Sequence, residues 1–114
     1  MSRHDDHVRL RHMLDHAREA LAMVENRARR DLDTDRQLNL SLVRLMEILG
    51  EAAARVTPAG RESLSSIPWP EIVGFRNRLI HGYDEVDLDI LWSTVNDDLP
   101  PLVTALEAWF AANS

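Results

Sequence analysis

The sequence predicts an all-α protein: an antiparallel up-and-down bundle of four helices, in a single domain that spans residues 1–114. Four segments repeat apolar residues at spacings of three and four, which is typical of helices with one buried face. The connections between these segments are short, which favours antiparallel neighbours. No segment shows the alternating pattern of a β-strand, and a chain of this length with 45% apolar residues can bury a core.

The first helix is expected from about Asp5 to Arg29, because no proline or glycine interrupts that stretch. A second helix is expected to begin at Thr34, since Thr34 and Gln37 have the spacing of a capping box. The stretch 57–60, Thr-Pro-Ala-Gly, should end it. Residues 61–66 are expected to form a loop with at most one helical turn.

The third helix should begin around residues 68–70, since proline is tolerated in a first turn. Gly82 is expected to end it, which would leave His81 in the last turn and Tyr83 just past the end.

The fourth helix should start near Asp87, a residue type suited to capping a helix. Its apolar residues keep one phase to the end of the sequence, although Pro100 and Pro101 fall inside it. Because proline removes a helical hydrogen bond and crowds the previous turn, we expect this last helix to be kinked at Pro100-Pro101, near residues 96–99.

Composition restricts the possible partners. A net charge of −6 argues against broad electrostatic binding of nucleic acid, so any RNA contact must be local. All 13 basic residues are arginine, which suits phosphate recognition, but genome composition is the favoured explanation because alanine is also frequent. There is no cysteine, no apolar run long enough for a membrane span and no signal-peptide pattern, so we expect a cytoplasmic protein.

One stretch, Arg-Asn-Arg-Leu-Ile-His-Gly-Tyr at 76–83, gathers side chains capable of chemistry. Arg76 offers a planar fork of donors for a phosphate, and His81 can exchange a proton near neutral pH. Asn77 can orient a neighbour or a phosphate oxygen. RNA can be cut without a metal when its 2′-hydroxyl attacks the adjacent phosphate, which needs a base, an acid and positive charge. These residue types can supply all three.

The spacing also permits a purely structural interpretation. On a regular helix Arg76 and His81 are about 140° apart, so they converge only if the helix loosens before His81 or if two copies meet. Alternatively, Arg76 pairs with Glu47 or Glu51 on another helix, and His81 is a cation at a helix C-terminus.

Other candidates are weaker. His12 and His16 have the spacing of metal ligands but lack a convincing third ligand, and a solvated helix face explains them. Three tryptophans could stack on bases, although their helical phase favours packing: Trp69, Trp92 and Trp109. The acidic run 84–87 is expected to be a solvated loop that favours the next helix start.

The order Arg76, four residues, His81, one residue, Tyr83 resembles the signature of HepT-like toxins, a branch of the HEPN superfamily. Flanking blocks resemble the same family in the same order: residues 47–53, 67–69, 86–88 and 96–100. The resemblance covers roughly the whole chain.

This resemblance implies a homodimer whose two motifs meet at the interface. It implies a metal-independent endoribonuclease without a cofactor, which cuts tRNA or mRNA to a 2′,3′-cyclic phosphate. Arg76 and His81 would be catalytic, Asn77 would assist, and Arg78 would contact an RNA phosphate. The protein would be the toxin of a type VII toxin–antitoxin system.

The resemblance also implies an antitoxin partner, a nucleotidyltransferase of the MNT type that silences the toxin by transferring AMP to Tyr83. Charge and bulk from AMP beside His81 would block RNA phosphate. Two alternatives stay open: an inactive HEPN binding module that docks a nucleotidyltransferase, and a plain structural dimer.

Overall fold

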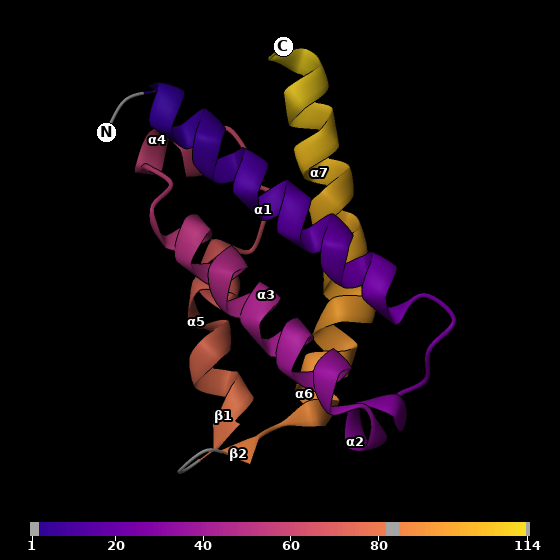
Figure 1. Cartoon of the computed structure of the whole chain (residues 1–114). Coiled ribbons are helices and arrows are strands. Elements are labelled where there is room, and N and C mark those ends of the chain that lie inside the picture. Colours follow the sequence, from indigo (N-terminus) through magenta and orange to yellow (C-terminus); the bar gives the residue numbers. More distant parts are fainter. Residues whose placement is uncertain (1–2, 82–84, 114) are drawn as a thin grey trace.

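Four long helical rods make up the described part of the molecule, joined by two very short helices and a small hairpin (Figure 1). The structure is a computed structural model that describes residues 3–81 and 85–113, with side chains from 5 to 80 and from 85 to 113. In chain order the elements are α1 (Arg3–Val24), α2 (Asp31–Thr34), α3 (Arg36–Ala54), α4 (Pro58–Glu62), α5 (Trp69–Leu79), β1 (Ile80–His81), β2 (Glu85–Val86), α6 (Leu88–Ser93), the π-helix η1 (Thr94–Asp98) and α7 (Leu99–Ala112).

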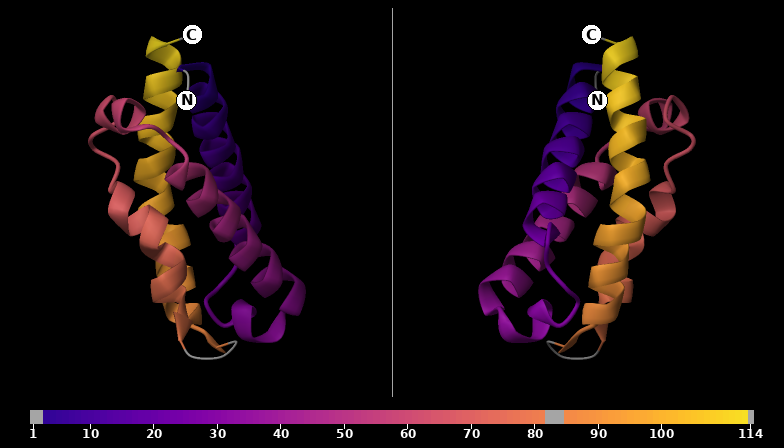
Figure 2. Two further views of the ribbon diagram at one scale, coloured as in Figure 1. Left: turned by 90° about the vertical axis from the view of Figure 1, so that its left-hand side faces the viewer. Right: turned by 90° about the vertical axis from the view of Figure 1, so that its right-hand side faces the viewer.

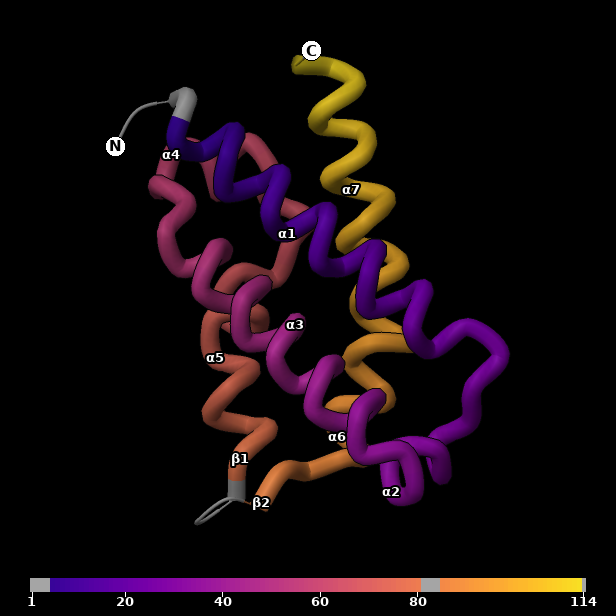
Figure 3. Tube along the Cα trace, in the orientation of Figure 1, coloured from indigo at the N-terminus to yellow at the C-terminus, as the bar shows by residue number. Residues whose placement is uncertain are grey.

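The rods are α1, α3, α5 and the continuous run α6–η1–α7, and they alternate in direction, which confirms the up-and-down bundle (Figures 1 and 2). α1 packs along α3 and against α7, while α5 packs on α3 and meets α6. The end of α7 and the beginning of α1 lie at one end of the molecule, and β1 and β2 lie at the other (Figure 3). The motif helix α5 therefore points toward the end of the bundle that carries the hairpin.

One apolar core lies between the rods, built from the helical stripes that the sequence predicts. Its largest side chains with almost no exposed surface come from every rod: Leu10, Met13, Leu14, Leu32, Leu42, Leu49, Leu79, Leu91, Val95 and Leu106. Within the described ranges, no helix combines the length and apolar character needed to cross a membrane.

α1 is shorter than expected, because it ends at Val24 and not at Arg29. Asn26 adopts φ 62°, in the left-handed region, which asparagine tolerates better than most residues and which an α-helix cannot contain. Arg29 lies beyond this turn and pairs with Asp33 of α2 and Asp89 of α6.

The predicted capping box at Thr34 is wrong. Thr34 is the last residue of the short helix α2, and α3 begins at Arg36 with Asp35 as its cap. The Asp35 carboxylate accepts a hydrogen bond of 3.1 Å from the Leu38 N–H. Aspartate outranks threonine as a cap, and Asp35 has the extended backbone that a cap requires.

The stretch expected only to end a helix also begins one. α3 ends at Ala54, and Thr57 then caps α4, its hydroxyl accepting from the Gly60 N–H at 3.1 Å. Asp6 of α1, which is 8% exposed, accepts hydrogen bonds from the Thr57 N–H at 2.9 Å and from its hydroxyl at 2.5 Å. This contact ties the start of α1 to α4 across 51 residues of sequence.

A kink was expected in the last helix near residues 96–99, and the structure has a π-helix in that region. Thr94–Asp98 is π-helical, and Pro100 and Pro101 fall in the first turn of α7. A π-helical turn inserts an extra residue, which relieves the clash between a proline ring and the previous turn without breaking the rod.

Candidate active site

The motif helix α5 is held against α3 by a close backbone approach. A side chain built at Gly50 of α3 would lie 3.4 Å from the Ile72 carbonyl oxygen of α5, so only a small residue fits there with ease. At the start of α5, buried Trp69 donates from Nε1 to the Leu64 carbonyl at 3.2 Å. The two helices therefore lie close enough for side chains one or two turns further on to meet.

Arg76 is the motif residue that faces α3. Its Nε lies 3.9 Å from Oε2 of Glu47, and its side chain is 68% exposed. This is the carboxylate partner that the structural interpretation anticipated, but the separation exceeds hydrogen-bond range, and exposed pairs of this kind contribute little. Arg76 therefore presents a guanidinium that its neighbour holds only weakly.

α5 ends earlier than predicted, so His81 does not lie in a helical turn. The helix stops at Leu79, and Ile80 is extended with φ −99° and ψ 121°. Ile80 and His81 form β1, which pairs antiparallel with β2 through Ile80–Val86 and His81–Glu85. The Asp87 N–H donates a hydrogen bond of 2.7 Å to the Leu79 carbonyl, which closes the hairpin. No strand was expected here.

The early end of α5 removes the geometric objection raised by the sequence. The angle of about 140° between Arg76 and His81 holds only for a continuous helix. Because the backbone leaves the helix at Ile80, the position of His81 is set by the hairpin instead. The loosening that the sequence required before His81 is present, and it begins at Ile80, two residues before Gly82.

The other two motif residues of α5 are exposed as well. Arg78 donates from Nη2 to the Glu71 carbonyl at 3.4 Å, and its guanidinium carbon lies 5.6 Å from the centre of the Phe75 ring. Asn77 lies between the two arginines in sequence and is exposed. Residues two apart on a helix are rotated by about 200° about its axis, so Arg76 and Arg78 lie on opposite flanks of α5.

Comparison with known proteins assigns the sequence to a family. The family described as Ribonuclease HepT-like matches residues 13–109, which include the whole of α5 and the hairpin. The chain belongs to the HepT-like ribonuclease family. It therefore falls in a class of RNA-cleaving enzymes.

Relatives of similar length support this assignment. A candidate RNase of Methanocaldococcus jannaschii is 30% identical over 107 residues, covering 94% of this chain and 98% of the relative. A candidate RNase of Caldanaerobacter subterraneus subsp. tengcongensis is 36% identical over 93 residues, covering 82% and 83%. A probable ribonuclease HepT of Thermococcus cleftensis is 34% identical over 88 residues, covering 74% and 80%. No solved structure matches the chain.

Part of the HepT-like motif lies outside the described residues. Gly82, Tyr83 and Asp84 belong to that part, and His81 is described by its backbone alone. The expected modification site at Tyr83 and the start of the acidic run 84–87 are therefore untested by the structure. Asp87 is described, and it caps α6 by accepting from the Ile90 N–H at 3.0 Å, as predicted.

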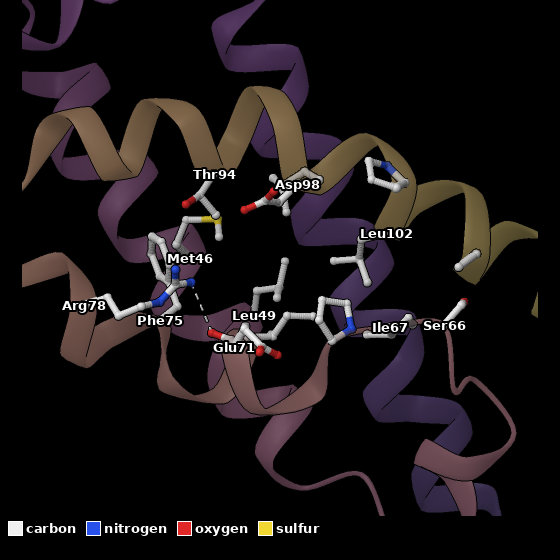
Figure 4. A pocket seen from close by; sticks show the side chains of 15 residues that line it. Met46, Leu49, Ser66, Ile67, Glu71, Phe75, Arg78, Thr94, Asp98 and Leu102 are labelled. Carbon is white, nitrogen blue, oxygen red and sulfur yellow. Dashed lines mark hydrogen bonds between the residues drawn. The ribbon is translucent and has the colours of Figure 1, made fainter.

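A pocket that the sequence did not predict lies on the Arg78 flank of α5. It encloses about 390 Å³ between α3, α5 and the run from η1 into α7 (Figure 4). Its walls are mostly apolar, with Met46, Leu49, Phe75 and Leu102 among them. The sequence contained one hint of this pocket, the distortion expected before Pro100. The π-helix found at that place forms one wall of the pocket.

The secondary candidates behave as structural residues. The His16 ring bonds through Nδ1 to the His12 carbonyl at 2.7 Å, and the described residues contain no cluster of three metal-ligating side chains. Trp69 is buried in the core, which confirms the packing interpretation for it. Trp109 is half-buried and packs edge-on against Phe110.

Several arginines form close ion pairs and so differ from Arg76. Arg27 bridges to Asp35 at 2.7 Å, Arg29 to Asp89 at 2.6 Å, and Arg18 to Glu107 at 2.5 Å. The Arg27 hydrogen bond lowers the pKa of the Asp35 carboxyl, and the Leu38 N–H lowers it further. These pairs are closer than the one that Arg76 makes.

Proposed function

We propose that this protein is a metal-independent endoribonuclease that acts as the toxin of a type VII toxin–antitoxin system, with tRNA or mRNA as substrate. The observation that carries the proposal is the state of Arg76. It is a largely exposed guanidinium on α5 whose one carboxylate contact, with Glu47, is as long as 3.9 Å, and it lies one turn before the backbone leaves the helix. Such a group is available to an RNA phosphate.

The chemistry needs no group beyond those of the chain and the RNA. The 2′-oxygen attacks the adjacent phosphorus, its proton passes to a base, and the bond from phosphorus to the 5′-oxygen breaks. An acid protonates the departing 5′-oxygen, and the product keeps a 2′,3′-cyclic phosphate. His81 supplies base or acid, Arg76 stabilises the charge that develops on the phosphorane, and Asn77 orients a phosphate oxygen.

Base and acid together require two copies of the motif, so we propose a homodimer with a shared cleft. The exposed large apolar side chains of the described part are Leu40 of α3, at 52%, and Val73 of α5, at 39%. Leu40 lies seven residues before Glu47, and Val73 three before Arg76, so each shares a helix face with its site neighbour. Burying this face against a second copy would bring the two Arg76 sites together.

Control by a partner follows from the same motif. We propose that a nucleotidyltransferase of the MNT type transfers AMP from ATP to Tyr83 in the cytoplasm. The tyrosine oxygen bonds to the α-phosphorus, pyrophosphate leaves, and the phenolic proton passes to a base of the partner. Tyr83 follows His81 by two residues, so the added phosphodiester charge would lie beside the catalytic group and repel RNA.

The net charge of −6 weakens long-range attraction of RNA and so favours a second candidate function. In that case the chain is a helical module that docks the nucleotidyltransferase and cuts nothing. One experiment separates the two: purified protein is incubated with total cellular RNA, with and without EDTA. Cleavage that survives EDTA and leaves 2′,3′-cyclic ends supports the enzyme. Intact RNA supports the docking module, and cleavage stopped by EDTA refutes the metal-free mechanism.

A further inference from the structure

The pocket on the Arg78 flank of α5 has the features of a ligand site. Its volume of about 390 Å³ falls within the usual range for small-molecule sites, roughly 300–1,000 Å³. One wall is the π-helix η1, and π-helical turns occur frequently at functional sites. Apolar surfaces from three rods face each other across it (Figure 4).

The pocket also contains hydrogen-bonding capacity that the described part of the chain does not use. Thr94 lines it and is only 7% exposed, yet its hydroxyl bonds to no other described group. The Thr94 oxygen is not among the fully buried unpaired side-chain atoms, so a group that enters the pocket can reach it and form a hydrogen bond. Thr94 and Asp98 are the first and last residues of η1, four apart and both on the pocket wall.

Two carboxylates accompany Thr94. Asp98 lies on the η1 wall and Glu71 on the α5 wall opposite, and neither forms an ion pair within the described residues (Figure 4). An ionised carboxylate only accepts hydrogen bonds, so a ligand that contacts these groups directly must carry N–H or O–H donors. The one cation of the pocket, Arg78, lies beside Glu71 and is exposed, so it can contact a phosphate outside the pocket.

A nucleobase combines these properties, and guanine does so best. Its flat apolar faces fit between the walls formed by Phe75, Met46 and Leu102. Its N1–H and exocyclic amine are adjacent donors that match the two oxygens of a single carboxylate, as in the reading of a flipped base by its pairing edge. Uracil offers one N–H, while adenine and cytosine each offer only an amine.

We propose that this pocket binds a guanine base, with Asp98 accepting from its pairing edge and Arg78 contacting a neighbouring phosphate. The base belongs to the RNA substrate, and this part of the inference rests on the ribonuclease function proposed above. Arg76 and the pocket lie on opposite flanks of α5, whose diameter is about 10–12 Å. The recognised guanosine therefore lies within a few nucleotides of the cleaved bond.

Methionine methyl signals give a direct test on the whole chain with guanosine as the probe. Met46 lines the pocket, whereas Met13 is fully buried elsewhere in the core. Guanosine should shift the Met46 signal saturably and leave Met13 unchanged, and inosine, which lacks the exocyclic amine, should bind several-fold more weakly. Asp98→Asn should weaken guanosine binding about tenfold, as for loss of a hydrogen bond to a charged group. Asp97→Asn, one residue away and outside the pocket, is the matched control.

The proposal is overturned if guanosine leaves Met46 unshifted, if adenosine and uridine bind as well, or if Asp98→Asn binds like wild type. Mapping the cut sites in RNA identifies the source of the base. Guanosine enriched near the cut, with the enrichment lost in Asp98→Asn, supports a base from the substrate. Guanosine binding without such enrichment overturns that part and indicates a free nucleoside. Guanosine binding without any RNA cleavage refutes the ribonuclease function but supports the pocket.

Discussion

Arg76 makes a longer carboxylate contact than Arg18, Arg27 and Arg29 do, and in this it resembles Arg11, which lies 4.0 Å from Asp15. Arg18, Arg27 and Arg29 each lie within 2.7 Å of a carboxylate oxygen, whereas Arg76 lies 3.9 Å from Glu47. A guanidinium held by a close partner must give up that partner before it can bind phosphate. Arg76 would lose only the long contact with Glu47 on binding phosphate, which favours a role in binding over a role in folding.

Arg76→Ala should lower the RNA cleavage rate by about 10²–10³-fold, as for removal of one group that stabilises transition-state charge. The melting temperature should stay within about 2 °C of wild type, because the Glu47 contact is long and exposed. Gel-based cleavage assays and thermal melts measure both quantities. Arg18→Ala, which removes an exposed arginine on α1, should cut RNA at the wild-type rate. A large loss of stability in Arg76→Ala would point back to a structural arginine.

Tyr83→Phe should remain an active nuclease and escape silencing, because the hydroxyl serves only as the AMP acceptor in the proposed scheme. Tyr83 is the only tyrosine, so intact-mass measurement after incubation with partner, ATP and magnesium reads modification directly. Wild type should gain one or a few AMP units and Tyr83→Phe none. Full neutralisation of the variant by the partner would mean that docking alone suffices.

At the scale of the elements, helix starts depend on which polar side chain reaches the first free amides. Asp35 rather than Thr34 caps α3, and Thr57 caps α4 while also bonding Asp6 of α1. A local cap and a distant contact are thus combined in one threonine. The first is a local signal, since threonine favours the cap and proline the first helical position, whereas the second joins residues 51 apart.

Thr57→Val should destabilise the protein by about 2 kcal/mol, since it removes a helix cap and leaves the buried Asp6 carboxylate with one donor fewer. Denaturant unfolding measures the change. Thr57→Ser keeps the hydroxyl and should lie close to wild type. Equal losses in the two variants would show that packing of the threonine methyl matters more than its hydrogen bonds.

The cap of α3 predicts a pH dependence. Hydrogen bonds, first from Arg27 and then from the Leu38 N–H, lower the pKa of Asp35 in the folded state. A lowered folded-state pKa contributes stability that is present above the unfolded value and is lost as pH falls through the folded value. Asp35→Asn keeps a good cap but not the charge, so it should melt below wild type at pH 7, and the gap should narrow as the pH falls below 3.8. Asp97→Asn, exposed and without an ion pair to a described residue, is the control; a constant gap across pH would contradict the linkage.

In the molecule as a whole, α3 and α5 share a face that carries exposed apolar side chains. Leu40 and Val73 are the exposed large apolar residues of the described part, and each lies on the helix face that carries Glu47 or Arg76. The proposed second copy would bury this face and supply the second histidine.

Val73→Asp should raise the dimer dissociation constant at least about 100-fold, because a carboxylate would be buried without a partner in the interface. Light scattering at micromolar concentration measures the mass, and RNA cleavage should fall with the dimer. Ala22→Asp, exposed on α1, should remain dimeric and active. A wild-type monomer that cuts RNA would refute the shared site.

The sequence by itself determined the helical class, the order of the four rods, the residues of their buried stripes and the family motif. These depend on the 3.6-residue period and on the spacing of a few side chains, which are local properties. The irregular last helix was predicted for the same reason, because Pro100 and Pro101 constrain the turn that precedes them.

Tertiary structure decided where α5 ends, how weakly Arg76 is held, and that a pocket exists. α5 ends at Leu79 because the Ile80–Val86 pairing and the Asp87 hydrogen bond to Leu79 replace further helical turns. The Arg76–Glu47 distance depends on how closely α3 approaches α5 at Gly50, and the pocket on how η1 faces α5. Each is a relation between segments far apart in the chain, and no local period or propensity encodes it.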